Sequence, residues 1–341
     1  MNTFGTVFRA GIFGESHGEE IGVVIDGVEP GIALSEKDFE ADIARRRSGA
    51  KGTTPRVEAD EPHILSGVYE GHTTGAPLAI VFRNTDTRSG DYAKFKDVPR
   101  PGHADFTAHV KYGGFQDPRG GGHFSGRLTL PVVAAGVVAK KVLAETVSEE
   151  TEGRVQFRCE ARLAEVGGIG DETRWEKALD AARQEGDSLG GIVECVVEGL
   201  PAGLGEPFWD SVESRLAHAL FAIPGVRGVE FGDGFAAARM KGSEHNDRFA
   251  PDPEHEGFVI PATNHAGGVN GGITNGNPIV FRVAFKPTSS IRKAQRTFDF
   301  EAGEMTDLEV PGRHDTCFAL RTPVVVEAMA AIVLADLIDL A

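Results

Sequence analysis

The chain has 341 residues, 40% of them hydrophobic, and a formal net charge of −16 at pH 7. A chain of this length and apolar content can bury a large core, in one large domain or two ordinary ones. The negative charge argues against a general nucleic-acid or membrane-surface binder, because such proteins need a positive potential over much of their surface; a local basic pocket is compatible with it.

Neither the cysteines nor the two ends of the chain indicate a secreted or membrane protein. The 3 cysteines are widely separated and odd in number, which indicates buried free thiols rather than a disulfide framework or a cysteine zinc site. The N-terminal segment lacks the apolar region of a signal peptide. The apolar stretch 323–340 is interrupted by Glu327, Asp336 and Asp339, which favours a core helix over a membrane span. We therefore expect a cytoplasmic protein.

Periodic apolar residues predict both helices and strands. Helical spacing recurs at residues 36–47, 132–147, 176–185, 210–222 and 324–340. In the first of these segments Ser35 can cap the helix with Asp38 three residues on, and Ser48-Gly49 supplies the stop. Strand-like runs cover residues 22–28, 78–82, 155–166, 192–198 and 279–286. The fold class is therefore mixed α and β.

Glycines gather in four places between these elements. The clusters lie at residues 14–18, 113–126, 225–234 and 267–276, and each predicts a loop shaped for close approach of a ligand. We find no stretch polar and featureless enough to be a linker, and no repeat of fixed period. We therefore expect one domain over residues 1–341.

Two loops hold a histidine between small or flexible residues. His17 lies between Ser16 and Gly18, and His103 lies between Gly102 and an alanine, so each imidazole is approachable by a ligand. Both are plausible acids or bases. The ordinary alternative is a turn residue whose hydrogen bonds are satisfied locally.

Several segments suit an anionic ligand. Residues 119–127 bracket three glycines with Arg119 and Arg127, so backbone amides and guanidiniums could hold an anion together. The strand exit at residues 286–290 offers one cation and three hydroxyls to a single phosphate. The ordinary alternatives are a flexible loop and a solvated strand exit.

Two further charged groups fit the same kind of ligand. The first is a cationic cluster on an otherwise acidic chain, comprising Arg45, Arg46, Arg47, Lys51 and Arg56. A dianionic phosphate with carboxylates would need such a cluster. The second is the triad at residues 313–315, which follows a glycine and precedes the apolar C-terminal helix. A solvated helix end and structural salt bridges are the alternatives.

These segments, in this order along the chain, resemble the chorismate synthase family. The matching segments are residues 13–18, 45–49, 53–56, 64–75, 84–89, 100–105, 119–127, 264–272, 286–291 and 312–315. One such motif would be weak support, but so many in register make a chance match implausible. The resemblance covers nearly the whole chain.

The resemblance implies an α+β fold of the family's single-domain β-α-β sandwich type, usually a homotetramer, with reduced FMN stacked against the substrate in a deep basic pocket. It implies a lyase of the shikimate pathway, which makes aromatic amino acids. That enzyme eliminates phosphate from 5-enolpyruvylshikimate 3-phosphate to give chorismate. The flavin lends electron density to the ring and recovers it, without net oxidation. NADPH is a candidate reductant, with an outside reductase as the alternative; no metal, nucleic acid or membrane is expected.

The resemblance also assigns roles to particular residues. His17 would protonate the departing phosphate, His103 would stabilise or protonate the reduced flavin, and Asp315 would assist flavin N5 in accepting the C6 hydrogen. Substrate contacts are expected from the cations Arg46, Arg47, Lys51 and Arg119. FMN contacts are expected at His123, Phe124, Ser125, Gly271, Lys286, Pro287, Thr288, Ser289, Ser290 and Arg313.

The chain departs from the family pattern after its run of glycines. The family commonly has Arg-Ser-Ser-Ala-Arg-Glu where residues 123–128 read His-Phe-Ser-Gly-Arg-Leu, so one flavin-facing arginine and one serine are replaced. Ser48 and Thr316 stand where prolines are usual, and the loop at 50–52 is shorter, with Lys51 as a compensating charge.

Two alternatives stay open from the sequence. One is a flavin- or nucleotide-binding protein that has kept the pocket but lost turnover, motivated by the change at His123 and Phe124. The other is a metal-dependent hydrolase using His103, Asp105 and His109, since carboxylate and imidazole ligands suit zinc or manganese.

Overall fold

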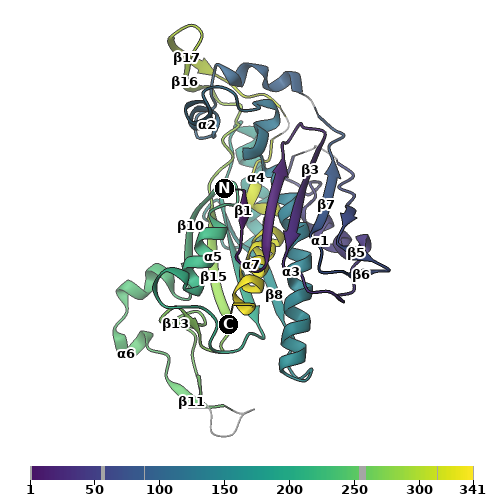
Figure 1. The fold of residues 1–341 in the computed structure, drawn as a ribbon. Coiled ribbons are helices and arrows are strands. Elements are labelled where there is room, and N and C mark those ends of the chain that lie inside the picture. Colours follow the sequence, from purple (N-terminus) through teal and green to yellow (C-terminus); the bar gives the residue numbers. More distant parts are fainter. Residues whose placement is uncertain (1, 55–57, 88, 253–258, 313, 341) are drawn as a thin grey trace.

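The fold consists of two antiparallel sheets on either side of a central pair of helices (Figure 1). It is seen in a computed structural model that describes residues 2–54, 58–87, 89–252, 259–312 and 314–340. This arrangement confirms the expected α+β class and its β-α-β layering.

The first sheet has five strands in the order β1-β2-β3-β7-β4, and each strand is antiparallel to its neighbours. The bounds are β1 (Thr3–Phe4), β2 (Arg9–Gly14), β3 (Glu20–Asp26), β7 (Leu78–Arg83) and β4 (His63–Ser66). Its inner face carries Ile21, Val23 and Ile25 at every second position, all fully buried. This alternation is what a sheet with one covered face requires.

The second sheet has four strands in the order β10-β15-β9-β8, again antiparallel throughout. The bounds are β10 (Val226–Phe231), β15 (Ile279–Phe285), β9 (Gly191–Glu198) and β8 (Arg158–Val166). Strand β15 buries Phe281 and Val283 toward the helices. Its last residue leads directly into the segment 286–290, which the sequence singles out for phosphate binding.

Two helices, α3 (Thr129–Glu150) and α7 (Pro323–Ile338), fill the layer between the sheets and pack on each other. Helix α3 lies against β3 and β7, and α7 lies against β8 and β9. Because neighbours surround it, every residue of α7 from Val324 to Ile338 is buried. The helices approach so closely that a Cβ atom added to Gly136 would lie 2.2 Å from that of Ala328. One core cluster therefore spans both sheets and both helices.

Shorter elements surround these layers. The helices are α1 (Glu40–Arg46), α2 (Asp105–Tyr112), α4 (Trp175–Gln184), α5 (Val212–Leu220) and α6 (Gly242–His245). The two-stranded pairs are β5 (Val68–Tyr69) with β6 (His72–Thr73), β11 (Phe249–Pro251) with β12 (Val259–Pro261), β13 (Val269–Asn270) with β14 (Ile273–Thr274), and β16 (Gln295–Asp299) with β17 (Glu304–Leu308). The 3₁₀ helices are η1 (Glu36–Phe39), η2 (Ser89–Lys96), η3 (Arg119–Phe124), η4 (Gly126–Leu128), η5 (Glu172–Arg174), η6 (Phe208–Asp210), η7 (Gly234–Arg239) and η8 (Phe318–Arg321).

Each predicted helix and strand has a counterpart in the structure, with three differences. The first predicted helix begins as η1 before it becomes α1, and the Asp38 carboxylate accepts the backbone N–H of Ser35 at 2.7 Å. The predicted glycine-rich loop at 225–234 is wrong, because it contains strand β10, which pairs with β15. The shorter elements are unpredicted, among them strands β2 and β4 and helix α2, and neither β2 nor α2 has enough periodic apolar residues to identify it.

Candidate active site

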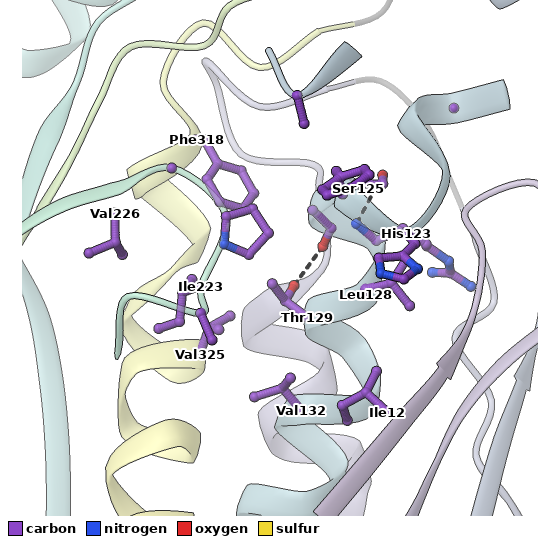
Figure 2. Close-up of a pocket in the computed structure, with 18 of the residues that line it drawn as sticks. Ile12, His123, Ser125, Leu128, Thr129, Val132, Ile223, Val226, Phe318 and Val325 are labelled. Carbon is purple, nitrogen blue, oxygen red and sulfur yellow. Dashed lines mark hydrogen bonds between the residues drawn. The ribbon is translucent and has the colours of Figure 1, made fainter. Parts of the chain in front are cut away.

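A pocket of about 1380 Å³ opens where the starts of α3 and α7 meet the ends of several loops. One end is apolar. Figure 2 shows Ile12 and Val132 on one side of that end and Ile223 and Val226 on the other, with Phe318 above them. The other end is polar and is lined by most of the residues that the sequence analysis singles out.

The structure brings together predicted residues that lie far apart in the sequence. The pocket lining includes Arg46, Arg47, His103, His123, Phe124, Ser125, Lys286, Pro287, Thr288, Ser289, Ser290 and Asp315. Predicted residues outside this lining are His17, Lys51, Arg119 and Gly271. Arg313 and Arg56, which the sequence also singles out, lie outside the described residues.

The two predicted histidines lie against neighbouring glycines of η3. A Cβ atom on Gly120 would lie 2.4 Å from Cδ2 of His17, and one on Gly121 would lie 3.3 Å from Nε2 of His103. Both glycines have positive φ angles, 61° and 82°, so they form a turn in a backbone conformation that residues with a side chain rarely adopt. Gly120 lines the pocket, so His17 lies against a lining residue without being part of the lining itself. The glycine run thus lets both histidine rings lie close to the backbone, and the close approach of a ligand stays a prediction.

His17 is buried and fixed in orientation by its neighbours. Its Nδ1 lies 3.1 Å from the Ser89 hydroxyl oxygen, and its ring meets Tyr92 edge to face at 5.2 Å. A ring held in this way keeps Nε2 on the side of Gly120. Such fixed placement is what a proton donor needs, since acid catalysis depends on geometry first.

His103 belongs to an ion-paired group at the start of α2. Its Nδ1 lies 2.6 Å from Oδ1 of Asp105, and Asp105 accepts two bonds from the Arg100 guanidinium, at 2.7 and 2.9 Å. Burial lowers the pKa of His103, although the hydrogen bond to Asp105 opposes that shift. Despite the burial of its carboxyl, hydrogen bonds from Arg100 and His103 hold the pKa of Asp105 well below its usual range. The group therefore favours a neutral imidazole beside an ionised carboxylate.

Residues 286–290 form a hydroxyl-rich turn beside His103. The Lys286 ammonium donates to the Ser289 hydroxyl, which in turn donates to the carbonyl of Gly102 at 2.7 Å. Burial and the neighbouring Arg227 lower the pKa of Lys286. The Thr288 hydroxyl is buried and makes no hydrogen bond within the described chain. An unsatisfied hydroxyl next to a half-buried cation is what an absent anionic ligand would leave.

A second cationic group lies at the end of α1 and the start of α3. Arg46 and Arg127 are both buried, and both reach the carboxylate of Asp60. Burial lowers the pKa of Arg46, and the nearby Arg321 lowers it further. Asp315 lies beside this group and accepts the Thr54 N–H and one N–H of Arg321, each at 2.8 Å. Buried guanidiniums therefore form part of the pocket lining.

The structure does not bring Lys51, Arg119 and Gly271 to this pocket, which corrects their expected placement. The Lys51 ammonium is exposed and pairs with Glu176 and Asp180 of α4. Arg119 folds back on Asp117, to which its guanidinium donates at 2.8 Å. Gly271 lies in the exposed turn between β13 and β14.

Sequence reasoning missed several residues that line the pocket. They are Asp60, Tyr92, Arg100 and Arg321. Arg100 lies inside a segment that resembles the family, so the signal was present without a role attached to it. Arg127 and His314, which the sequence singles out for an anionic ligand, also line the pocket. Asp60, Tyr92 and Arg321 reach the pocket only through the tertiary fold, and we find no sequence signal for them.

The residues of the proposed metal site do not assemble. Asp105 is engaged by Arg100 and His103, and the ring of His109 stacks on Phe300 at 4.6 Å. Among the residues that the structure describes, no group of three His, Cys, Asp or Glu side chains is placed to hold a metal ion. Nothing in this arrangement supports the metal-dependent hydrolase.

His314 gives a prediction for the pH dependence of stability. Burial, reinforced by Arg100, lowers its pKa to about 4. In the unfolded chain its pKa returns to about 6.5, so the folded state loses stability as the pH falls from about 6.5 toward 4. His314→Gln should remove part of this loss, on the order of 1 kcal/mol after allowance for partial exposure. Thermal unfolding at pH values from 7.5 to 4.5 measures this loss of stability in the parent and in the variant. The exposed His63→Gln serves as control, and equal pH slopes for both variants would contradict the assignment.

The fold and the pocket together define an α+β protein with a cation-rich site for an anionic small molecule. A family model described as chorismate synthase matches residues 8–338. The chorismate synthase of Chitinophaga pinensis is 60% identical over 336 residues, covering 98% of this chain and 96% of that protein. That of Korarchaeum cryptofilum is 46% identical over 349 residues, covering 98% and 96%.

A solved structure agrees with these relatives. It is described as the crystal structure of chorismate synthase, and it aligns with a TM-score of 0.72 and 27% identity over 98% of this chain and 92% of that chain. The chain belongs to the chorismate synthase family, as the order of its motifs predicts. In the described part of the chain, none of the helices is long and apolar enough to cross a membrane.

Proposed function

We propose that this pocket is the active site, and that the chain uses reduced FMN there. As a member of the chorismate synthase family, the chain is a lyase of the shikimate pathway that eliminates phosphate from 5-enolpyruvylshikimate 3-phosphate to give chorismate. The observation that carries the site proposal is the placement of His17 and His103 on neighbouring glycines, at a pocket that buried guanidiniums also line. A polyanionic substrate needs such cations, and its departing phosphate needs an acid.

The residues at the polar end fit a flavin phosphate. The unsatisfied Thr288 hydroxyl and the half-buried Lys286 lie with the hydroxyls of Ser289 and Ser290 in one segment of the pocket lining. A pocket of 1380 Å³ has room for two ligands at once. Reduced FMN, when bound, would supply electron density to the substrate ring as phosphate leaves and take it back afterwards.

The remaining predicted contacts divide into two groups. His123 and Phe124 line the pocket beside Ser125, so they would lie along the flavin ring in place of the family's usual arginine and serine. Gly271 lies outside the pocket, so its FMN contact would require a second copy of the chain in the proposed homotetramer. The shared core supports the proposal of a single domain over residues 1–341.

The chain's own groups account for the proton movements. His17 would deliver a proton to the departing phosphate oxygen, and His103 would hold its neutral ring toward the cofactor, steadied by Asp105. Arg46 and Arg47 would neutralise the anions of the substrate. Asp315 would receive the proton that originates at C6.

Burial of these groups also excludes water from the reacting atoms. Arg46 and Asp315 are nearly inaccessible to solvent, and the partly buried His103 lines the same pocket. Charges in a dry pocket interact more strongly than in water, so each guanidinium stabilises the developing phosphate charge more effectively. The proposal of a cytoplasmic enzyme fits a pocket that uses a reduced cofactor.

Anaerobic turnover with pre-reduced FMN tests the proposal. We expect equal amounts of phosphate and chorismate from 5-enolpyruvylshikimate 3-phosphate, with no net consumption of reduced flavin. A parallel reaction with oxidised FMN and NADPH tests whether the chain reduces its own flavin. Tight FMN binding without any chorismate would instead support the alternative of a flavin-binding protein that has lost turnover.

Lys286→Ala should weaken FMN binding more than it slows turnover. The ammonium lies at the hydroxyl-rich turn, where it would bind the flavin phosphate, a group remote from the reacting carbon. We expect an increase of about tenfold in the FMN concentration for half-maximal rate, the usual scale for losing one charged hydrogen bond. Saturating FMN should restore the rate to near that of the parent, and a defect that excess FMN cannot rescue would contradict the assignment. The exposed Lys293→Ala, which loses a surface pair with Asp187, is the matched control.

A further inference from the structure

Asp60 has an unusual backbone conformation in a buried position. Its φ angle is 51°, in the left-handed region, and only 4% of its surface is exposed. A residue with a side chain seldom adopts this conformation unless its surroundings over-determine it, and such outliers gather at functional sites. Its carboxylate lies at the pocket wall.

The Asp60 carboxylate joins two guanidiniums that come from different parts of the chain. Its Oδ1 accepts an N–H of Arg127, in η4 just before α3, and its Oδ2 lies 3.4 Å from NH1 of Arg46, at the end of α1. Each of the three side chains is at most 6% exposed. Buried charges require partners of this kind, because an unpaired one has lost its hydration.

The other donors of both guanidiniums are also fixed. Arg46 donates through Nε to the Thr129 hydroxyl at 3.0 Å and through NH2 to the Gly126 carbonyl at 3.2 Å. Arg127 donates through Nε to the Asn84 side-chain oxygen at 2.9 Å. These partners are uncharged, whereas Asp60 is the carboxylate that both cations share.

The local charge favours an anion even with Asp60 present. Arg46 also feels the guanidinium of Arg321, which is paired with Asp315. Within this group, three guanidiniums face two carboxylates, so an arriving anion would complete the balance. Removing the Asp60 charge would increase repulsion between Arg46 and Arg127 while it increases the attraction for anions.

We propose that Asp60 is a positioning residue: it holds Arg46 and Arg127 together in the geometry that the leaving phosphate requires, at a cost in anion affinity. The inference rests on the proposed active site. On this inference, the positive charge alone promotes substrate binding, whereas turnover needs the two guanidiniums in fixed places. Asp60 therefore limits how tightly the pocket holds an anion before reaction.

Asp60→Asn tests this directly, because asparagine keeps the size and tolerates the left-handed backbone while it removes the charge. We expect kcat to fall by about tenfold, with KM for the substrate unchanged or lower. Inorganic phosphate, used as a probe and measured by calorimetry without flavin, should bind severalfold more tightly than to the parent. A purely structural carboxylate would give the opposite pattern, with a higher KM, weaker phosphate binding and a lower melting temperature together.

Two further variants keep the result interpretable. Asp60→Gly relieves the positive-φ strain and removes the carboxylate, so it gives the same kcat and phosphate readouts if asparagine fails to fold. Asp336→Asn removes a fully buried carboxylate that pairs with Arg215 away from the polar end, and it should lower the melting temperature while leaving kcat near the parent value. Parent-like kcat and phosphate affinity in both Asp60 variants would overturn the inference. Absent turnover in the parent itself would instead count against the proposed function.

Discussion

His17→Ala and His103→Ala should each fold normally and lose about 10²-fold or more in turnover, the usual scale for losing a positioned acid or base. Both side chains lie against the glycine pair of η3, so removing either leaves a small void and no backbone strain. The loss should persist at saturating substrate and FMN, because the missing group acts on the reaction and not on binding alone. Steady-state phosphate release under anaerobic conditions measures it.

A third histidine provides the control within the same pocket. His218 lines the apolar end, where its ring meets Phe4 edge to face at 5.7 Å. His218→Ala should keep a turnover close to that of the parent. Rates near the parent value in His17→Ala or in His103→Ala would remove that histidine from the mechanism. A loss equal to theirs in His218→Ala would mean that any cavity in the pocket slows the reaction.

The main helices and strands were predictable because burial leaves a clear pattern in the sequence, whereas their layering was implied only by the family resemblance. Strand β15 alternates between buried and half-buried residues, and α7 is apolar on every face because a sheet and other helices surround it. Strand β10 escaped prediction because the glycines within and beside it resemble those of a loop. Its place is set by pairing with β15, a contact between distant segments that local periodicity does not contain.

The site was predictable where the chemistry is local to one motif. The turn at Lys286 and the glycines beside His103 carry their donors within a few residues, and the fold only has to bring them together. Lys51 shows the limit of this reasoning. Glu176 and Asp180 lie one helical turn apart on α4 and become its neighbours only in the folded chain. A cation that belongs to a basic cluster in the sequence thus pairs with whichever carboxylates the tertiary structure places nearest to it.

Asp315→Asn should bind substrate as well as the parent does, while a single turnover slows by roughly two orders of magnitude. Asparagine can still accept the Thr54 N–H that Asp315 accepts at 2.8 Å, so the loop should keep its shape. It cannot take up a proton at working pH. Without the negative charge, the guanidinium of Arg321 has lost its carboxylate partner. The binding of an anionic substrate should therefore become stronger and not weaker.

The competing explanation is that Asp315 serves only to hold Arg321, whose guanidinium donates an N–H to the Asp315 carboxylate at 2.8 Å. Arg321→Gln distinguishes the two, because it breaks the same pair while it keeps the carboxylate. If Asp315 moves the proton, Arg321→Gln should raise KM and retain most of the single-turnover rate, whereas Asp315→Asn should lose the rate and retain KM. If the pair is merely structural, both variants should lose thermal stability in parallel and show the same modest change in rate. Chorismate formation in rapid-quench single turnovers, beside melting temperatures for both variants, decides between these outcomes.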